Sequence, residues 1–140
     1  MNASGLLSIL HYRRKKKKMK NKRVLVCDDD KDILEMLEIA LEINGFEVIS
    51  EHDSTRIFRT IDSSSPDAVL LDLWMPVLSG DEIVKKLRED PSKNSIPVVV
   101  ISASQDGKEV ALRAGANQYL EKPFDIDKLV MCLNEVLSSN

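Results

Sequence analysis

The sequence predicts an α/β domain in which helices cover both faces of a five-stranded parallel sheet. Short apolar runs alternate five times with segments whose apolar residues recur at helical spacing. Two of these runs, Ala68–Asp72 and 96–101, are apolar almost throughout, which is typical of strands buried on both faces. The chain has 140 residues, 43% of them hydrophobic and 4% aromatic, which suits one domain with a core of Val, Ile and Leu. No segment approaches the roughly 18 apolar residues that a membrane span needs.

The first half of the chain supplies two strands and two helices. The first strand is Arg23–Cys27 (RVLVC), and apolar residues at positions 33, 36, 37, 40 and 43 predict a helix that ends before Gly45. A second, more polar strand is expected over 46–50. A short helix is expected over 54–62, where the first residue is a capping serine and a serine run followed by proline ends the helix.

The second half continues the alternation. The strand Ala68–Asp72 is followed by a helix over 79–89, which an Asp-Pro pair stops. The strand over 96–101 contains a proline near its start and leads to a helix over 108–114 that a glycine ends. Two further elements complete the chain: a strand over 117–120 and a helix over 125–137 with its apolar residues on one stripe.

This alternation predicts how the sheet is connected. Strand–helix–strand units are right-handed and give parallel neighbours, so five strands linked by helices form a doubly wound sheet. We expect the strand order 2-1-3-4-5, with five helices and with strands one and three adjacent where the order reverses. All five carboxyl ends then lie at one edge, which is where ligands bind in open α/β sheets.

Charge divides the chain into two parts. Residues 1–23 hold nine Lys or Arg and no acid, whereas the whole chain has 20 Lys and Arg, 23 Asp and Glu, and a net charge of −3. We expect residues 1–22 to be a disordered basic tail and residues 23–140 to be the folded domain. The tail has further interpretations: a tether to anionic lipid or nucleic acid, a linker after a membrane segment, or a start site misassigned upstream of Met19.

The composition of the folded part argues against two kinds of function. Its acidic balance, without a basic stripe, argues against nucleic-acid binding by the domain itself. Cys27 and Cys132 are far apart and lie in apolar patterns, so they indicate reduced core thiols of a cytoplasmic protein rather than a metal or redox site.

Polar residues stand at the predicted carboxyl ends of four strands. They are Asp28 and Asp29, Asp72, Ser102, and Lys122. Three converging carboxylates raise one another's pKa unless a cation neutralises them, and oxygen ligands without His favour Mg²⁺. A hydroxyl and an ammonium at the same edge suit the remaining oxygens of a phosphoryl group. The pattern therefore indicates phosphoryl transfer onto a carboxylate.

Taken one by one, most of these residues have ordinary structural explanations. Acids after the first strand cap a helix, Ser102 is typical of a turn, and Lys122 of a solvated surface. A helix needs one capping acid, however, and the run from 28 to 30 supplies three. Asp72 at the end of a buried strand has no comparable structural explanation. All of these residues stand at the carboxyl ends of strands, and this shared position favours a functional site over separate structural roles.

Over residues 23–137 the sequence resembles the receiver domain of two-component response regulators. The motifs that carry the resemblance are VLVCDDD, LLDLWMPVLSG, VVVISA and AGANQYLEKPF. The resemblance implies a flavodoxin-like fold with Asp72 as the phosphoacceptor. It implies that Asp29, Asp72 and the backbone carbonyl of Trp74 ligate Mg²⁺, and that Asp28 acts through a metal-bound water.

The resemblance also assigns roles at the last two strands. Ser102 and Lys122 would bind the acyl phosphate, Tyr119 would be the aromatic switch, and the Lys122-Pro123 bond would be cis. Only twenty residues separate Ser102 from Lys122, about two fewer than expected for the family, so the helix between them should be short. Trp74 is unusually large for its position, where it either covers the loop or gates the site.

We expect a single-domain response regulator that accepts a phosphoryl group from a histidine kinase, a histidine phosphotransfer protein or a small phosphodonor. It would catalyse its own phosphorylation and slow dephosphorylation, without turnover of an external substrate, and would signal to a protein target. Three alternatives remain: a Mg²⁺-dependent phosphohydrolase with an aspartyl nucleophile, an interaction module that is not phosphorylated, and a fragment of a hybrid histidine kinase or larger regulator.

Overall fold

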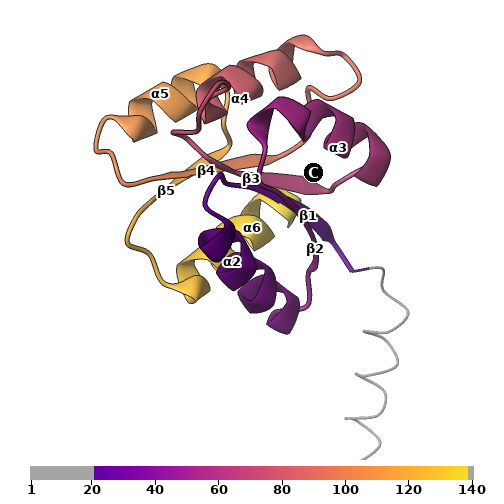
Figure 1. Cartoon of the computed structure of the whole chain (residues 1–140), viewed down its shortest axis with the longest axis vertical. Helices are drawn as coiled ribbons and strands as arrows, with labels where there is room; N and C mark the ends of the chain where they lie inside the picture. Colours follow the sequence, from indigo (N-terminus) through magenta and orange to yellow (C-terminus); the bar gives the residue numbers. More distant parts are fainter. Residues whose placement is uncertain (1–20, 139–140) are drawn as a thin grey trace, which may run out of the picture.

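The computed structural model describes residues 21–138 and consists of a central sheet between two layers of helices. The expectation of a disordered tail concerns residues 1–20, which lie outside the described residues. One layer contains α3, α4 and α5, and the other contains α2 and α6 (Figure 1). The strands are β1 (Arg23–Cys27), β2 (Glu47–Glu51), β3 (Ala68–Asp72), β4 (Val98–Ser102) and β5 (Gln118–Glu121). The helices are α2 (Lys31–Ile43), η1 (Ser54–Arg56), α3 (Ile57–Ser64), α4 (Gly80–Glu89), α5 (Gly107–Ala114) and α6 (Ile126–Ser138).

The sheet has the predicted order. All neighbours are parallel, and the sequence of strands is β2-β1-β3-β4-β5. In the centre, Val24 of β1 pairs with Val48 on one side and Ala68 on the other. Every residue of β3 and of β4 is buried, as the continuous apolar runs predicted. The carboxyl ends of β1 and β3 are therefore neighbours at one edge of the sheet.

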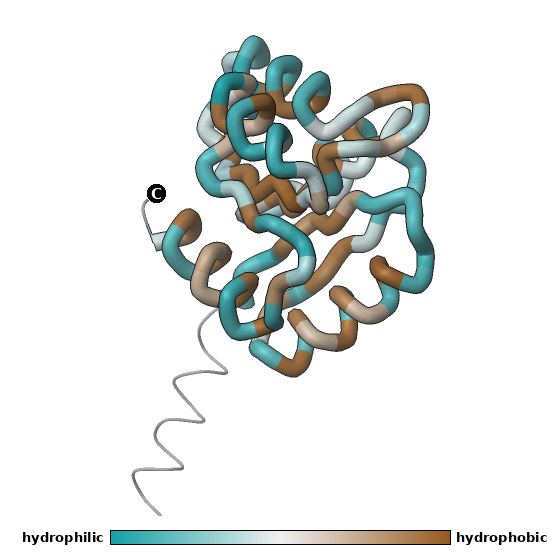
Figure 2. Tube along the Cα trace, turned by 90° about the vertical axis from the view of Figure 1, so that its left-hand side faces the viewer, coloured by the Kyte–Doolittle hydropathy of each residue, from teal (hydrophilic) through white to brown (hydrophobic). Residues whose placement is uncertain are grey.

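Two hydrophobic cores fill the space between the sheet and its helix layers. Side chains alternate along each strand, so Leu25 and Cys27 of β1 lie in the core under α3, α4 and α5. Val24 and Val26 lie in the core under α2 and α6. Figure 2 shows hydrophobic residues along the strands in the middle of the molecule, and hydrophobic and hydrophilic residues in alternation along the helices. Burial on both faces holds the strand ends firmly in place.

Several predicted boundaries differ from the structure by a few residues, and three of the differences have a clear physical cause. The helical segment after β2 is capped by Asp53, whose carboxylate accepts a hydrogen bond from the amide of Thr55 at 3.0 Å. The predicted cap, Ser54, is instead buried, and its hydroxyl donates to the carbonyl of Pro76. The fourth strand begins at Val98 rather than at 96, since Pro97 has no N–H for the ladder. The second strand begins one residue late, because the amide of Phe46 closes the preceding turn onto Leu41.

The buried stripe of α2 shares only Leu37 with the residues whose spacing predicted the helix. Leu34, Leu37 and Leu41 face the sheet. Met36 and Ile43, two of the residues whose spacing predicted the helix, are 47% and 80% exposed. The helix is apolar on more than one side, and only the leucine stripe meets the sheet. None of the helices in the described part of the chain has the length and apolar character of a membrane span.

Candidate functional site

The three acids after β1 have separate roles in the structure. Asp30 is the N-cap of α2, and its carboxylate accepts the amides of Asp32 at 2.9 Å and Ile33 at 3.3 Å. Asp28 is 1% exposed, and its Oδ1 accepts the amide of Asp30 at 2.9 Å. Asp29 is exposed. Helix capping thus accounts for one acid of the run and leaves Asp28 and Asp29 for another purpose.

The end of β3 is fixed by close contacts with the loop that follows it. Asp72 is 8% exposed, and the amide of Leu73 donates to the carbonyl of Ile101 at 2.9 Å, which holds the loop against β4. Gly80 begins α4 so close to this strand that a Cβ there would lie 2.6 Å from the carbonyl oxygen of Asp72. The glycine is required by this close approach, because any side chain would push α4 away from the site.

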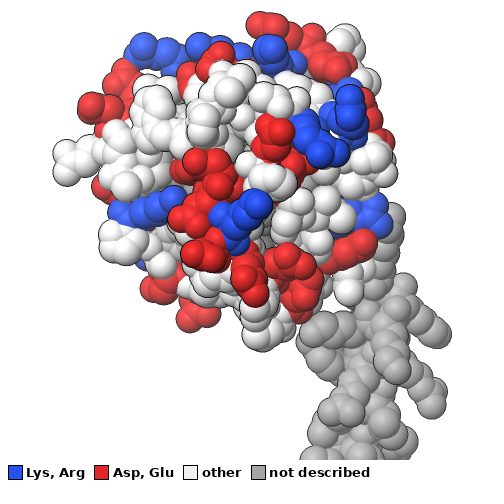
Figure 3. Space-filling model, in the orientation of Figure 1, with Lys and Arg blue, Asp and Glu red and all other residues white. Residues whose placement is uncertain are grey.

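The carboxylates of Asp28, Asp29 and Asp72 form one cluster. One oxygen from each lies within 4.8 Å of the others. On the face in Figure 3, acidic side chains gather near the middle of the molecule beside basic ones. Burial, followed by the charge of Asp28, raises the pKa of Asp72 from 3.8 to about 6. Burial is also the main cause that raises the pKa of Asp28. The cluster therefore favours a cation.

One lysine reaches the cluster from the neighbouring strand end. The Nζ of Lys122 lies 3.7 Å from Asp72 Oδ1 and 3.9 Å from Asp28 Oδ2. Both distances are too long for hydrogen bonds, so the two contacts are ion pairs. The buried Oδ2 of Asp28 has no hydrogen-bond partner among residues 21–138. Three carboxylates face one ammonium group, so the cluster keeps an excess of negative charge.

The donor atoms of this cluster fit Mg²⁺. They are carboxylate oxygens, and one of them is buried without a hydrogen bond. The nearest sulfur ligand in sequence, Cys27, belongs to the core, where its Sγ lies 3.7 Å from the Sδ of Met75. Burial raises the pKa of the Cys27 thiol to about 12, so it remains protonated and is a poor ligand. Oxygen ligands alone favour a hard cation.

Ser102 and Lys122 are held at adjacent strand ends. Ser102 is 1% exposed, and its Oγ accepts the amide of Ser104 at 3.1 Å. The amide of Lys122 donates to the carbonyl of Ser102 at 2.9 Å, and the Lys122-Pro123 bond is cis, as expected. The Ser102 hydroxyl donates to no acceptor in the described part of the chain, which leaves its proton available for a ligand.

Trp74 and Tyr119 occupy different surroundings. Trp74 is 55% exposed, so most of its indole surface faces solvent. Tyr119 is half-buried against the core under α5, and its hydroxyl donates to the carbonyl of Ser104 at 2.6 Å. Sequence reasoning did not identify Ser104 as its partner, because the shape of the β4–α5 loop decides which carbonyls meet the hydroxyl. The helix α5 is short, as the spacing from Ser102 predicted.

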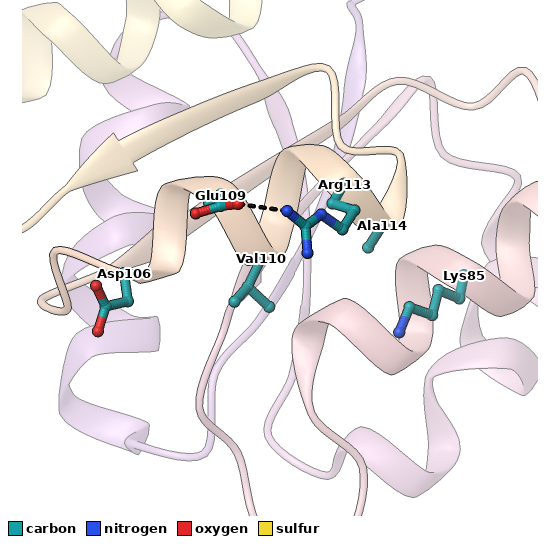
Figure 4. A pocket seen from close by; sticks show the side chains of 6 residues that line it. All are labelled: Lys85, Asp106, Glu109, Val110, Arg113 and Ala114. Carbon is teal, nitrogen blue, oxygen red and sulfur yellow. Dashed lines mark hydrogen bonds and ion pairs between the residues drawn. The ribbon is translucent and has the colours of Figure 1, made fainter.

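A second hollow lies between α4 and α5 (Figure 4). It is lined by Lys85, Asp106, Glu109, Val110, Arg113 and Ala114. Glu109 and Arg113 form an ion pair within α5, and their side chains are 74% and 77% exposed. Exposed pairs of this kind contribute little to stability. The residues predicted to carry chemistry all lie instead at the carboxyl edge of the sheet.

A family model matches most of the chain. The model of the response regulator receiver domain matches residues 24–134. The chain belongs to this receiver domain family.

Curated relatives are regulatory proteins of about twice the matched length. The chain is 44% identical over 117 residues to the transcriptional regulatory protein PrrA of Mycobacterium tuberculosis. The match covers 82% of this chain and 49% of PrrA, so the chain spans about half the length of the curated relatives it matches. The receiver domain is thus shared with proteins that have a further region.

Solved structures share the receiver fold. A response regulator from Chloroflexus aurantiacus superimposes with a TM-score of 0.81 at 30% identity, covering 85% of this chain and 99% of that one. The receiver domain of the sensor histidine kinase PA1611 from Pseudomonas aeruginosa has a TM-score of 0.78 at 26% identity, covering 85% and 99%. That structure is described with a magnesium ion coordinated in its active-site cleft.

Proposed function

We propose that this receiver domain accepts a phosphoryl group on Asp72 in a Mg²⁺-dependent reaction. The observation that carries the proposal is the clustering of Asp72 with two further carboxylates and Lys122 at one edge of the sheet. A nucleophile needs an approach path, and Asp72 is the last residue of its strand, at the edge where the loops open. The donor would be a histidine kinase, a histidine phosphotransfer protein or a small acyl phosphate.

The chemistry requires Asp72 in its ionised form. A carboxylate oxygen of Asp72 forms a bond to phosphorus, the bond from phosphorus to the donor's nitrogen or oxygen breaks, and the leaving group keeps the electron pair. Burial opposes ionisation of Asp72, and the nearby ammonium of Lys122 favours it. Lys122 then lies where it can attract the oxygens of the transferred group, and the free proton of the Ser102 hydroxyl can be donated to one of them.

The cation site would consist of Asp28, Asp29, Asp72 and the backbone carbonyl of Trp74. When bound, Mg²⁺ supplies positive charge that balances the carboxylates and the phosphoryl oxygens. Asp28 and Asp72 are held rigidly by β1 and β3, whereas Asp29 is exposed and free to adjust. The buried Asp28 Oδ2, which has no hydrogen bond in the described residues, supports this assignment.

The output of the domain would be protein contact. Tyr119, as the switch residue, links the site to the loop before α5 through the Ser104 carbonyl. We propose that residues 23–140 act as one signalling domain. In a longer protein of the PrrA kind, the domain would control the additional region.

Phosphorylation with acetyl phosphate tests the proposal. The unmodified protein should gain one phosphoryl group in the presence of Mg²⁺ and not in EDTA, as measured by intact mass. Asp72→Asn should abolish labelling, and hydroxylamine should remove the label, because it cleaves acyl phosphates. Asp127→Asn is a matched control, since Asp127 is an exposed acid on α6.

Two results would contradict the proposal. Labelling that survives Asp72→Asn would place the phosphoryl group elsewhere, and absence of labelling in the unmodified protein would favour an interaction module. Phosphate release from p-nitrophenyl phosphate with multiple turnovers would instead favour the phosphohydrolase alternative.

A further inference from the structure

The loop after β3 contains a turn in which Val77 has an unfavourable backbone conformation. The φ of Val77 is +69°, and the amide of Leu78 donates across it to the carbonyl of Pro76 at 2.8 Å. A hydrogen bond across one residue makes a γ-turn, and the form with positive φ is rare and strained. The strain is larger for a β-branched valine than for glycine. Val77 is 87% exposed, so burial of its side chain does not stabilise this conformation.

Ser54 reaches this turn from a different part of the chain. It is the first residue of η1 and is 4% exposed, and its Oγ donates to the carbonyl of Pro76, 22 residues later, at 3.0 Å. The Pro76 carbonyl therefore accepts one hydrogen bond from within the turn and one from outside it. A strained backbone conformation persists where the surrounding structure determines it, and the Ser54 hydroxyl provides such a contact.

The turn lies next to the part of the loop that belongs to the proposed cation site. The amide of Gly80 donates to the carbonyl of Leu73 at 2.8 Å, which closes the loop, and Met75 is buried in the core. Trp74, whose carbonyl is a proposed Mg²⁺ ligand, lies two residues before Pro76 and is 55% exposed. The path of the backbone around Met75 therefore depends on where the Pro76 carbonyl is held.

We propose that Ser54 is a positioning residue for the cation site, because its hydroxyl holds the strained turn at Val77 in place. Without this hydroxyl, Val77 relaxes to negative φ in a share of the molecules, and the backbone from Trp74 to Pro76 shifts with it. Only molecules that keep the turn bind Mg²⁺ fully, so the apparent affinity falls in proportion to their share. This consequence for Mg²⁺ rests on the proposed function, whereas the support of the turn by Ser54 does not.

The turn is measured first in metal-free buffer. Trp74 is the only tryptophan of the chain, so incorporation of 5-fluorotryptophan gives one ¹⁹F resonance beside the turn. This resonance should shift and broaden in Ser54→Ala and should return to its original position in Ser54→Ala/Val77→Gly, because glycine adopts positive φ without support. Ser63→Ala is the control, since it removes an exposed hydroxyl that bonds within α3. An unchanged resonance in folded Ser54→Ala would overturn the inference.

Titration with Mg²⁺ at constant ionic strength, followed by the same resonance, tests the link to the cation. The dissociation constant should rise about fivefold in Ser54→Ala, the factor that corresponds to one net hydrogen bond. Val77→Gly and Ser63→Ala should keep the unmodified value, and Ser54→Ala/Val77→Gly should recover it. An equal loss of affinity in Ser54→Ala and in the double variant would show that Ser54 does not act through the turn, and would overturn the proposal.

A variant of similar shape covers the case in which Ser54→Ala does not fold. Ser54→Cys replaces the hydroxyl by a weak donor, and the same shift and the same recovery with Val77→Gly are expected. Failure of both Ser54 variants to fold would assign Ser54 to the stability of the fold as a whole and would overturn its role in the turn.

Phosphorylation with acetyl phosphate gives a separate readout. Ser54→Ala should be labelled about fivefold more slowly than the unmodified protein at limiting Mg²⁺ and at the same rate at saturating Mg²⁺, because only cation binding is impaired. A rate that stays low at saturating Mg²⁺ would overturn the assignment to the cation site. Absence of labelling in every protein, the unmodified one included, would contradict the proposed function, and the ¹⁹F comparison in metal-free buffer would still decide whether Ser54 holds the turn.

Discussion

At the scale of single residues, neighbouring carboxyl groups of the same type have different roles because their surroundings differ. Asp30 ends its run as a helix cap with two amide partners. Asp28 is buried beside a lysine, and Asp72 combines burial with a like charge. A buried carboxylate that repels its neighbour lowers the stability of the folded state when it ionises. Repulsion among the ionised carboxylates therefore lowers the stability of the fold, and a bound cation or the removal of one carboxylate should reduce this repulsion.

Asp72→Asn should raise stability in metal-free buffer at pH 8. The folded pKa of Asp72 is about 6, above its ordinary value of 3.8, so the folded state binds this proton more tightly than the unfolded state does. The ionised group therefore opposes folding above about pH 6, and its effect disappears below pH 4. The gain should be on the order of 2 kcal/mol at pH 8. Urea unfolding at both pH values measures it, and a gain of the same size at pH 4 would contradict this cause.

Trp74→Asn should speed loss of phosphate from the phosphorylated protein. Hydrolysis needs a water in line with the bond from Asp72, and Trp74, two residues later on the same loop, has no amide or carboxylate to orient that water. Groups that position water contribute ~100-fold to such rates, so an amide should recover part of that factor. Decay of the label after removal of acetyl phosphate is the measurement. Val77→Asn, on the same loop at an 87% exposed residue, is the control. Equal decay in all three proteins would show that Trp74 has no influence on the water.

At the scale of elements, the helix α2 is positioned by only part of its apolar surface. The leucine stripe of α2 meets the sheet, whereas Met36, Ile39 and Ile43 line a shallow groove on its outer side. Only the leucine side of the helix therefore contributes hydrophobic stabilisation by burial, although the residues on both sides are similar in hydrophobicity.

Alanine substitutions should distinguish the two sides of α2. Leu37 is 0% exposed, so Leu37→Ala should lower the free energy of unfolding by about 2–5 kcal/mol through lost burial and a cavity. Met36 is 47% exposed, and Met36→Ala should cost less than about 1 kcal/mol. Urea unfolding of the two variants gives the comparison, and similar losses would mean that the outer stripe is also covered in solution.

Arg88 ties the end of α4 to two loops. Its guanidinium donates to the carbonyls of Gly115 at 2.9 Å, Ile96 at 2.8 Å and Asn94 at 3.1 Å. It also donates to the side-chain oxygen of Asn117 at 2.8 Å. Burial lowers the pKa of Arg88, and these acceptors compensate for the lost hydration. The glycine and asparagine of the AGANQY motif thus have structural rather than catalytic roles.

Removal of this guanidinium should destabilise the domain. Arg88→Ala leaves several carbonyl groups without a donor, which should cost at least about 2 kcal/mol in the free energy of unfolding. Arg88→Lys should restore little, because one ammonium group cannot reproduce the planar set of donors. Arg113→Ala, which removes an exposed pair within α5, is the control and should cost less than about 0.5 kcal/mol. Full stability of Arg88→Lys would show that charge alone suffices.

At the scale of the whole molecule, the site unites four strands that are far apart in sequence. Any ligand that binds these strand ends therefore stabilises the entire fold. Millimolar Mg²⁺ should raise the melting temperature of the unmodified protein by a few degrees, relative to NaCl at the same ionic strength. Asp72→Asn should reduce this rise, since it removes one carboxylate of the cluster. A melting temperature that does not respond to Mg²⁺ would contradict the cation site.

The sequence by itself determined the order of the elements and the edge at which the site forms. A continuous apolar run such as Ala68–Asp72 and the apolar residues three or four apart in a helix are both patterns of neighbouring residues, so both are visible in the local sequence. Parallel connections then bring all carboxyl ends to one edge. Asp28, Asp72 and Lys122 could be predicted to converge for this reason.

Only the tertiary structure decided which surfaces and contacts are used. The sheet selects the leucine stripe of α2 over the stripe of Met36 and Ile43, because burial depends on strands that are distant in sequence. The space that requires a glycine at 107 is bounded by Leu73 in the loop after β3, by Ser102 at the end of β4 and by Tyr119 of β5. Local periodicity contains no information about such packing, since each of these contacts is made by residues that only the folded chain brings together.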